Sequence, residues 1–280
     1  MRISYSEYKN YLECPKKYKL SSDWVEPPEP QNKYFALYGI TIQKFFENYS
    51  NYYLKKASSY TQEQVKELLK GIWATVLNKN YVNWREPFVR QNSEGIFNDI
   101  YKDILANIDK FDFFSRATSE LKIVINLKNS GDQLVGKLDF VFKDENDKII
   151  ILDGKGTNKI GKNIDIDQLY FYALIYLLRN KRLPDKLGFL YYKFQTIDYL
   201  DFNRDDVINF KNRLAAVKKT IKDEKEFKAN VSLSKSCLYC PYSLTCTPCQ
   251  TKKAENRAKK AARGGGLVID SDDIIASFGL

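Results

Sequence analysis

The feature that most constrains the fold of this chain is a pair of short apolar runs joined by an acidic turn. The runs 136–142 and 149–155 alternate or are rich in β-branched residues, as strands are, and residues 144–147 have the composition of a tight turn. A hairpin centred on this turn would place Asp139 opposite Asp153, where facing side chains lie roughly 5 Å apart. The sequence therefore predicts two antiparallel strands with a pair of facing carboxylates.

The two acids indicate a metal site. Carboxylates this close repel, and one would take up a proton unless a cation lay between them; oxygen ligands favour Mg²⁺ or Mn²⁺. Strand alternation puts Lys155 on the face of Asp153, and it leaves the Gly154 carbonyl approachable because glycine has no side chain. We expect Asp139, Asp153 and the Gly154 carbonyl to hold the metal, and Lys155 to orient and polarise a bound water.

A polar pair follows on the next predicted helix. Asp165 and Asp167 are typical of a helix's first turn, and Gln168 and Tyr172 lie four residues apart on one face. Both side chains could orient the lysine or a phosphate. The candidate catalytic residues are therefore Asp139, Asp153, Lys155, Gln168 and Tyr172.

These motifs run in the order G-x-x-D, hydrophobic-D-x-K and Q-x-x-x-Y, and in this the chain resembles the RecB-like branch of the PD-(D/E)XK nucleases. The alternative is an ordinary charged hairpin followed by a helix. The resemblance implies an α/β, restriction-endonuclease-like core with a mixed sheet flanked by helices. It also implies a metal-dependent DNA exonuclease acting on single-stranded ends in recombination, repair or replication.

Five cysteines give a second signal. Cys14 stands alone, and the others follow as C-x2-C-x5-C-x2-C from residue 237 to residue 249. The first three of these, with Cys14 and the surrounding residues 3–18, resemble the pattern of RecB-like enzymes that carry an iron–sulfur cluster, namely the CRISPR-adaptation exonucleases and the AddB-type helicase–nuclease subunits. The resemblance implies a 4Fe–4S cluster on Cys14, Cys237, Cys240 and Cys246, with Cys249 spare.

A zinc site is the competing interpretation of the cysteines. It would use Cys237 and Cys240 with Cys246 and Cys249, leaving Cys14 as a small buried residue. Zinc ribbons usually separate their two pairs by roughly 15–20 residues, more than this chain has. The cluster would tie residue 14 to residues 237–246 and so contribute much of the stability of the terminal segments.

The chain contains no histidine, which excludes Ser-His-Asp triads, HNH and HD nucleases and two-histidine iron sites. It also departs from the nucleases that it resembles, whose early helix usually carries a metal-binding histidine where this chain has Gln43. A glutamine oxygen can coordinate magnesium, so Gln43 is a candidate metal ligand. The alternative is a surface glutamine on a half-buried helix.

The formal charge of +10 suits a phosphate-backbone partner, and some of the 20 Tyr and 17 Phe could stack on unpaired bases, although most rings are expected in the core.

There is no apolar run of about 20 residues and no signal peptide at residues 1–4, so we expect a soluble, cytoplasmic protein without a membrane partner.

The predicted elements are helices near 35–56, 61–80 and 96–114, strands near 120–128, 134–143 and 148–156, a helix at 165–179, a strand at 187–194 and a helix at 203–224. The predicted segments are an N-terminal segment (1–30), a helical region (31–116), a nuclease core (117–230), a cysteine-rich segment (231–250) and a terminal segment (251–280).

The terminal segment combines a basic, helical run at 252–263, three glycines and an acidic-then-apolar end. That end resembles docking peptides of DNA-replication proteins, and a single-strand-binding protein or a sliding clamp could receive Ile274, Ile275, Phe278 and Leu280. The alternative is an acidic tail that shields the basic run from DNA.

Other functions remain open at this point. The chain could be a non-catalytic DNA-binding or assembly subunit, or a helicase-associated accessory protein. It has no Gly-x4-Gly-Lys-Ser/Thr loop, so any motor would be a partner.

Overall fold

The computed structural model describes residues 1–56, 60–128, 130–161, 164–231, 237 and 240–262. The chain divides into two compact units. The first consists of Met1–Tyr5, Lys33–Arg85 and Val89–Leu214, and the second of Ser6–Asn32, Glu86–Phe88 and the described residues from Ala215 onward.

The strands are β1 (Arg2–Ile3), β2 (Thr118–Leu127), β3 (Asp132–Lys143), β4 (Ile149–Lys155), β5 (Lys186–Tyr191) and β6 (Thr196–Leu200). The α-helices are α1 (Tyr5–Glu13), α2 (Pro15–Ser22), α3 (Leu37–Asn48), α4 (Gln62–Lys79), α5 (Ser93–Lys110), α6 (Ile166–Asn180), α7 (Arg204–Asp223) and α9 (Thr247–Ala262). Shorter helical turns are η1 (Tyr34–Ala36), the π-helical η2 (Tyr49–Tyr53), η3 (Asp112–Ser115) and η4 (Tyr192–Phe194).

A mixed sheet forms the centre of the first unit. Strand β3 pairs along most of its length with β2, in antiparallel orientation, so β1 and β4 must share its other edge, at opposite ends of the strand. Strand β4 continues in parallel to β5, and β5 pairs antiparallel with β6. This arrangement places the end of β4, where Asp153 and Lys155 lie, beside both β3 and β5.

The β3–β4 hairpin has the register that the sequence predicted. Phe140 pairs with Leu152, so the next pair outward is Asp139 with Asp153. The turn is fixed by Asp144, whose Oδ1 accepts the backbone N–H of Asn146 at 2.9 Å and of Lys148 at 3.0 Å. This local side-chain capping is typical of aspartate in turns.

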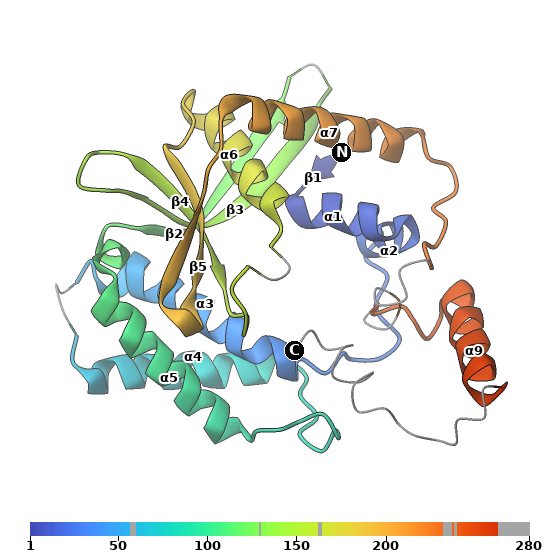
Figure 1. Cartoon of the computed structure of the whole chain (residues 1–280), viewed down its shortest axis with the longest axis horizontal. Coiled ribbons are helices and arrows are strands. Elements are labelled where there is room, and N and C mark those ends of the chain that lie inside the picture. Colours follow the sequence, from blue (N-terminus) through green and yellow to red (C-terminus); the bar gives the residue numbers. More distant parts are fainter. Residues whose placement is uncertain (57–59, 129, 162–163, 232–236, 238–239, 263–280) are drawn as a thin grey trace. The chain divides into compact units, whose positions relative to one another are not determined.

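Helices cover the sheet. Figure 1 shows α6 on one side of the sheet, and α3, α4 and α5 together on the other. Phe46 of α3 stacks on Phe114 and Tyr192, with ring centroids 4.1 and 5.5 Å apart, and so links the helical layer to the end of β5. The α/β class with a mixed sheet flanked by helices is confirmed.

The predicted helix near 61–80 is α4, and Thr61 and Gln64 form a reciprocal capping box at its start. The predicted helical run after the cysteines is confirmed as far as Ala262, within α9. The two-residue strand β1 and the edge strand β6 were not predicted, because neither is long enough to show a clear alternation.

The second unit has a small aromatic core of its own. Tyr11, Tyr18 and Ile221 are buried together, with Val217 and Phe227 packed against them. The Tyr11 hydroxyl donates a hydrogen bond to Glu224, which joins α1 to the end of α7. Among the described residues, no helix is both long and apolar enough to cross a membrane.

Candidate active site

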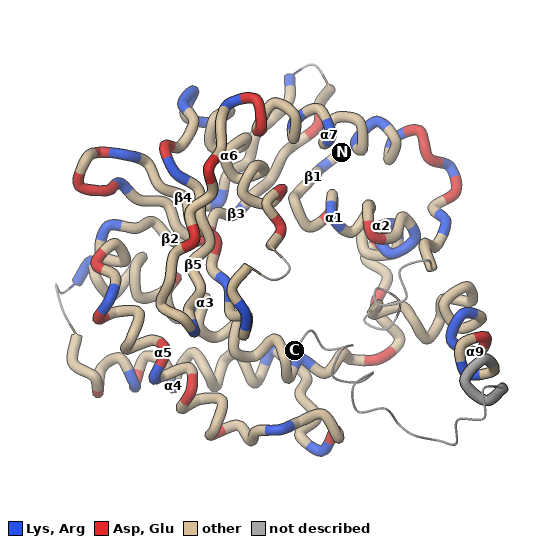
Figure 2. The backbone as a smooth tube through the Cα atoms, in the orientation of Figure 1, with Lys and Arg blue, Asp and Glu red and all other residues tan. Residues whose placement is uncertain are grey.

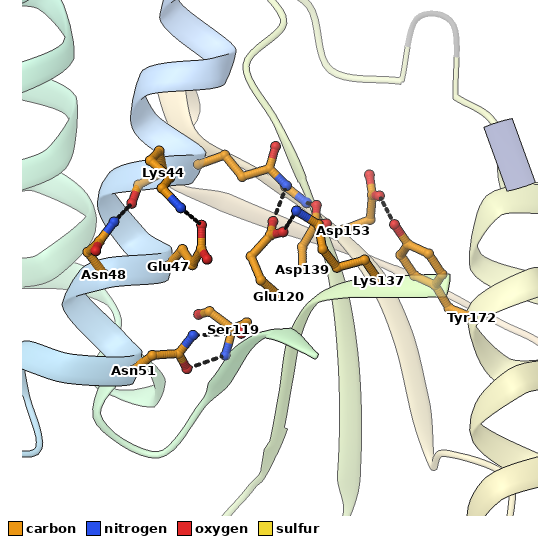
Figure 3. A network of polar contacts seen from close by, with 12 residues as sticks. Lys44, Glu47, Asn48, Asn51, Ser119, Glu120, Lys137, Asp139, Asp153 and Tyr172 are labelled. Carbon is orange, nitrogen blue, oxygen red and sulfur yellow. Dashed lines mark hydrogen bonds and ion pairs between the residues drawn. The ribbon is translucent and has the colours of Figure 1, made fainter. Parts of the chain in front are cut away.

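The two predicted acids lie side by side, Asp139 within β3 and Asp153 near the end of β4 (Figure 3). Asp139 is 7% exposed and Asp153 is 1% exposed. The Gly154 backbone N–H donates a hydrogen bond of 2.9 Å to Oδ2 of Asp139 and thus ties the two strands together between the acids. Both carboxylates are therefore buried, close and fixed by backbone geometry.

Burial and mutual repulsion change the acidity of this pair. Burial, followed by the charge of Asp153, raises the pKa of Asp139 to about 8, although Gly154, Lys155 and Lys137 oppose the rise. Burial also raises the pKa of Asp153, against the ammonium of Lys155. The pair therefore retains a proton near neutral pH when no other cation is present.

Lys155, Gln168 and Tyr172 close a ring of contacts around Asp153. The Lys155 ammonium lies 2.6 Å from Asp153 Oδ2 and donates to Gln168 Oε1 at 3.2 Å. Gln168 donates to the Tyr172 hydroxyl at 3.0 Å, and that hydroxyl donates to Asp153 Oδ1 at 3.3 Å. Helix α6 thus positions the acid and the lysine together, and the structure brings all five candidate catalytic residues to one place.

The two acids suit a magnesium or manganese ion that takes only a few ligands from the protein. No group of three or more His, Cys, Asp or Glu that could hold a metal is present in the described part of the chain. Mg²⁺, however, often takes only one or two protein carboxylates and completes its shell with waters and substrate phosphate. Two buried acids with raised pKa values suit such an ion because its charge would relieve their repulsion.

Tyr192 belongs to this site but was not predicted. An added Cβ at Gly154 would lie 2.2 Å from the Tyr192 hydroxyl, so the glycine is needed to make room for the phenol. Tyr192 is 1% exposed, and its hydroxyl has no hydrogen-bond partner among the described residues. Burial, then the charges of Asp139 and Asp153, raise its pKa well above the usual value. A buried hydroxyl without a partner is costly, and its place beside the acids suits a donor to a bound ligand.

Nothing in the sequence distinguished Tyr192 from a core aromatic, because it ends an apolar run. Its backbone is fixed by Asn107, a fully buried residue of α5 whose side-chain N–H₂ donates to the Tyr192 carbonyl at 2.7 Å. The sequence explained Gly154 by the access that it gives to its carbonyl. The structure gives a further reason, because a side chain at this position would collide with Tyr192.

Gln43 contacts a second residue that sequence reasoning missed. Its Nε2 donates to Glu120 Oε1 at 2.7 Å, and Lys137 forms an ion pair with the same carboxylate (Figure 3). The Glu120 side chain is 6% exposed and its φ is +58°, a conformation that non-glycine residues seldom adopt. The Gln43 amide thus donates a hydrogen bond to Glu120 in this structure. Glu120 lies on β2, the strand that pairs with β3, which carries Asp139. Nothing in the sequence marked Glu120, because its burial and its positive φ follow from the folded structure.

The cysteines lie in the second unit. Burial raises the pKa of Cys237 to about 12, and contact with Cys249, then the nearby Cys14 and Cys240, add to the rise. Burial also raises the pKa of Cys240, with Cys14 and Cys246 contributing. Cys14 thus lies near enough to affect Cys237 and Cys240, and Cys249, the expected spare, contacts Cys237. Among the described residues, however, no three cysteines form a group that could hold a metal.

The expected docking residues Ile274, Ile275, Phe278 and Leu280 lie outside the described residues.

A first prediction concerns the pH dependence of stability in EDTA. The folded Asp139 carboxyl has a higher pKa than the unfolded one, so its contribution is complete below about pH 4 and is lost as the pH rises through about 8. Asp139→Asn should remove this loss, and urea unfolding at about pH 5 and about pH 8 measures it. An unchanged difference between the two pH values in the variant would contradict the assignment.

A second prediction compares two glycines. Gly154→Ala should lower the free energy of unfolding by about 1–3 kcal/mol, because the new methyl group collides with Tyr192. Gly71→Ala, within α4 and with open space around it, should raise it by roughly 0.5–1 kcal/mol through helix propensity. Urea denaturation of both proteins provides the test, and equal changes would refute the steric role of Gly154.

The chain is similar to a protein-family model and to solved structures. The chain resembles the crystal structure of SSO0001, with 14% identity, 88% of this chain and 86% of that chain covered and a TM-score of 0.37. It also resembles a putative exonuclease from Eubacterium rectale, with 15% identity, 89% and 87% covered and a TM-score of 0.48. No curated protein matches the sequence. The model of the PD-(D/E)XK nuclease superfamily matches residues 2–247, and the chain therefore belongs to that superfamily.

Proposed function

We propose that this nuclease is a metal-dependent DNA exonuclease of the RecB-like type, which hydrolyses phosphodiester bonds at single-stranded ends. The observation that carries the proposal is the ring of contacts in which Lys155, Gln168 and Tyr172 surround Asp153, with Asp139 opposite. Superfamily membership supports the hydrolytic chemistry. The single-stranded substrate and its end rest on the resemblance of the motifs to RecB-like enzymes.

Each residue of the ring has a chemical role in this proposal. Asp139, Asp153 and the Gly154 carbonyl would hold Mg²⁺ or Mn²⁺, which supplies charge for the phosphoryl oxygens and lowers the pKa of a water. The Lys155 ammonium would orient the attacking water and polarise it. Gln168 keeps that ammonium in place, and Tyr172 holds the orientation of the Asp153 carboxylate.

Charge supports a nucleic-acid substrate. The chain has a formal net charge of +10, and Figure 2 shows lysines and arginines on α2 and α9 as well as around the sheet. Such charges bind the phosphate backbone by releasing counterions, so affinity should fall steeply with salt.

We also propose that the second unit carries a 4Fe–4S cluster on Cys14, Cys237, Cys240 and Cys246. The support is that Cys14, more than 200 residues away in sequence, lies close enough to raise the pKa of Cys237 and Cys240. Zinc on the four C-terminal cysteines is the alternative, and the contact of Cys249 with Cys237 favours it.

A second candidate function is a DNA-binding or assembly subunit with weak or no turnover. The observation in its favour is that Gln43 replaces the histidine of related enzymes and donates to Glu120. Docking of residues 267–280 on a single-strand-binding protein or sliding clamp is a separate proposal that fits either function.

The cleavage prediction uses matched lysines. Lys155→Ala should reduce Mg²⁺- or Mn²⁺-dependent cleavage of end-labelled single-stranded DNA by roughly 100-fold or more, because one group that stabilises the transition state is lost. Lys143→Ala changes an exposed lysine at the other end of the same hairpin and should leave cleavage intact. Normal cleavage by folded Lys155→Ala protein would remove Lys155 from the mechanism, and no cleavage by the wild type would favour the assembly subunit.

The cysteine prediction separates the two metal groups. Under the cluster proposal, Cys14→Ser abolishes the broad visible absorbance of an iron–sulfur protein, whereas Cys249→Ser leaves it unchanged. Metal analysis accompanies the spectra. A colourless protein with one zinc per chain, insensitive to Cys14→Ser, would establish the zinc alternative.

A further inference from the structure

An open pocket lies in the segment that leads into α5, within the first unit. Its volume is about 460 Å³, in the size range of small-ligand sites. Its lining residues are Trp84, Val89, Arg90, Gln91, Asn92 and Ser93. None of the candidate catalytic residues contributes to it.

Hydrogen bonds fix the backbone of this pocket. The Tyr34 hydroxyl accepts the backbone N–H groups of Arg90 and Gln91 at 3.1 and 3.0 Å. The same ring packs edge-on against Trp84, with centroids 6.1 Å apart. Tyr34 therefore holds both walls of the pocket in position.

The polar side chains of the lining are largely committed to the protein. Gln91 Nε2 donates to Asp99 at 2.8 Å, and Asn92 Oδ1 caps α5 through the N–H of Gly95 at 2.8 Å. Ser93 Oγ accepts the indole N–H of Trp73 at 3.3 Å. The pocket is thus preformed, which lowers the entropic cost of binding a ligand.

Two side chains of the pocket, Trp84 and Arg90, remain available to bind a ligand. Trp84 is half-buried, so part of its indole is accessible, and Arg90 is exposed. In the described part of the chain, no carboxylate forms an ion pair with Arg90. An indole offers a planar surface for stacking, and an unpaired guanidinium offers bidentate hydrogen bonds to a phosphate.

The combination matches one nucleotide of a single strand, whose base would stack on Trp84 while a neighbouring phosphate meets Arg90. Bases within a duplex are not free to stack in this way, and sequence-tolerant stacking beside cationic groups is how proteins hold single-stranded nucleic acids. The adjacent Arg85 and the net charge of +10 add to the attraction for a polyanion.

We propose that the Trp84–Arg90 pocket is a binding subsite for single-stranded DNA, separate from the carboxylates, that retains the strand while its end is cleaved. This proposal rests on the proposed function for the identity of the ligand. It adds a substrate-binding site to the catalytic one and assigns it a base and a phosphate.

The test measures binding in EDTA, where no cleavage occurs. A thymidine oligonucleotide is titrated into the full-length protein, and tryptophan fluorescence is followed. Stacking should quench the signal, Trp84→Ala should remove the quenching, and Arg90→Ala should weaken binding by about tenfold. Because Arg90 is exposed, its variant also covers the case in which Trp84→Ala fails to fold.

Two control variants make the result specific. Trp24→Ala removes a tryptophan that is 87% exposed and outside the pocket, and it should leave the binding-dependent quenching in place. Arg204→Ala removes an equal charge at the start of α7 and should weaken binding much less than Arg90→Ala. Quenching that disappears with Trp24, or equal effects of the two arginines, would overturn the pocket assignment.

A final comparison separates this proposal from the catalytic one. If the wild type cleaves DNA but Trp84→Ala and Arg90→Ala bind the oligonucleotide normally, the pocket proposal fails and the nuclease stands. Quenching at Trp84 in a protein that cleaves nothing supports the pocket and removes the exonuclease. Thymidine monophosphate that binds as tightly as the oligonucleotide would contradict a strand-binding site.

Discussion

The burial of two facing carboxylates is the constraint on which the rest of this site depends. Asp139 and Asp153 repel one another in a place that water barely reaches, and the β3–β4 register leaves them no way to separate. The contacts around the two acids partly offset that repulsion. Lys155 supplies a positive charge, Tyr172 and the Gly154 N–H supply hydrogen bonds, and the pair still holds a proton.

The parts of the fold that the sequence predicts are those with local physical causes. The hairpin register follows from a short acidic turn between two apolar runs, and the α4 start follows from the Thr61–Gln64 pair. Gln168 and Tyr172 meet the lysine and the acid because helical spacing puts them on one face. Each inference needed only residues that are close in the chain.

The parts that the sequence does not predict depend on packing between distant segments. Tyr192 reaches Gly154 because β5 pairs in parallel with β4 and because Asn107 anchors its carbonyl from another helix. Glu120 meets Gln43 only once α3 lies against the sheet, and its positive φ has no signature in the residue itself. The strand and helix periodicities of a sequence carry no information about such long-range contacts.

The candidate catalytic residues all come from one continuous stretch, 139–172, made of a hairpin and the helix after it. Contacts between near neighbours in sequence require little loop closure, so this stretch can assemble without waiting for the chain ends to meet. The segments before and after it supply other parts of the site: Tyr192, which packs against Gly154, and Asn107, which holds the Tyr192 carbonyl. The reactive groups are thus encoded in one stretch of sequence, whereas the space around them is shaped by residues from both sides of it.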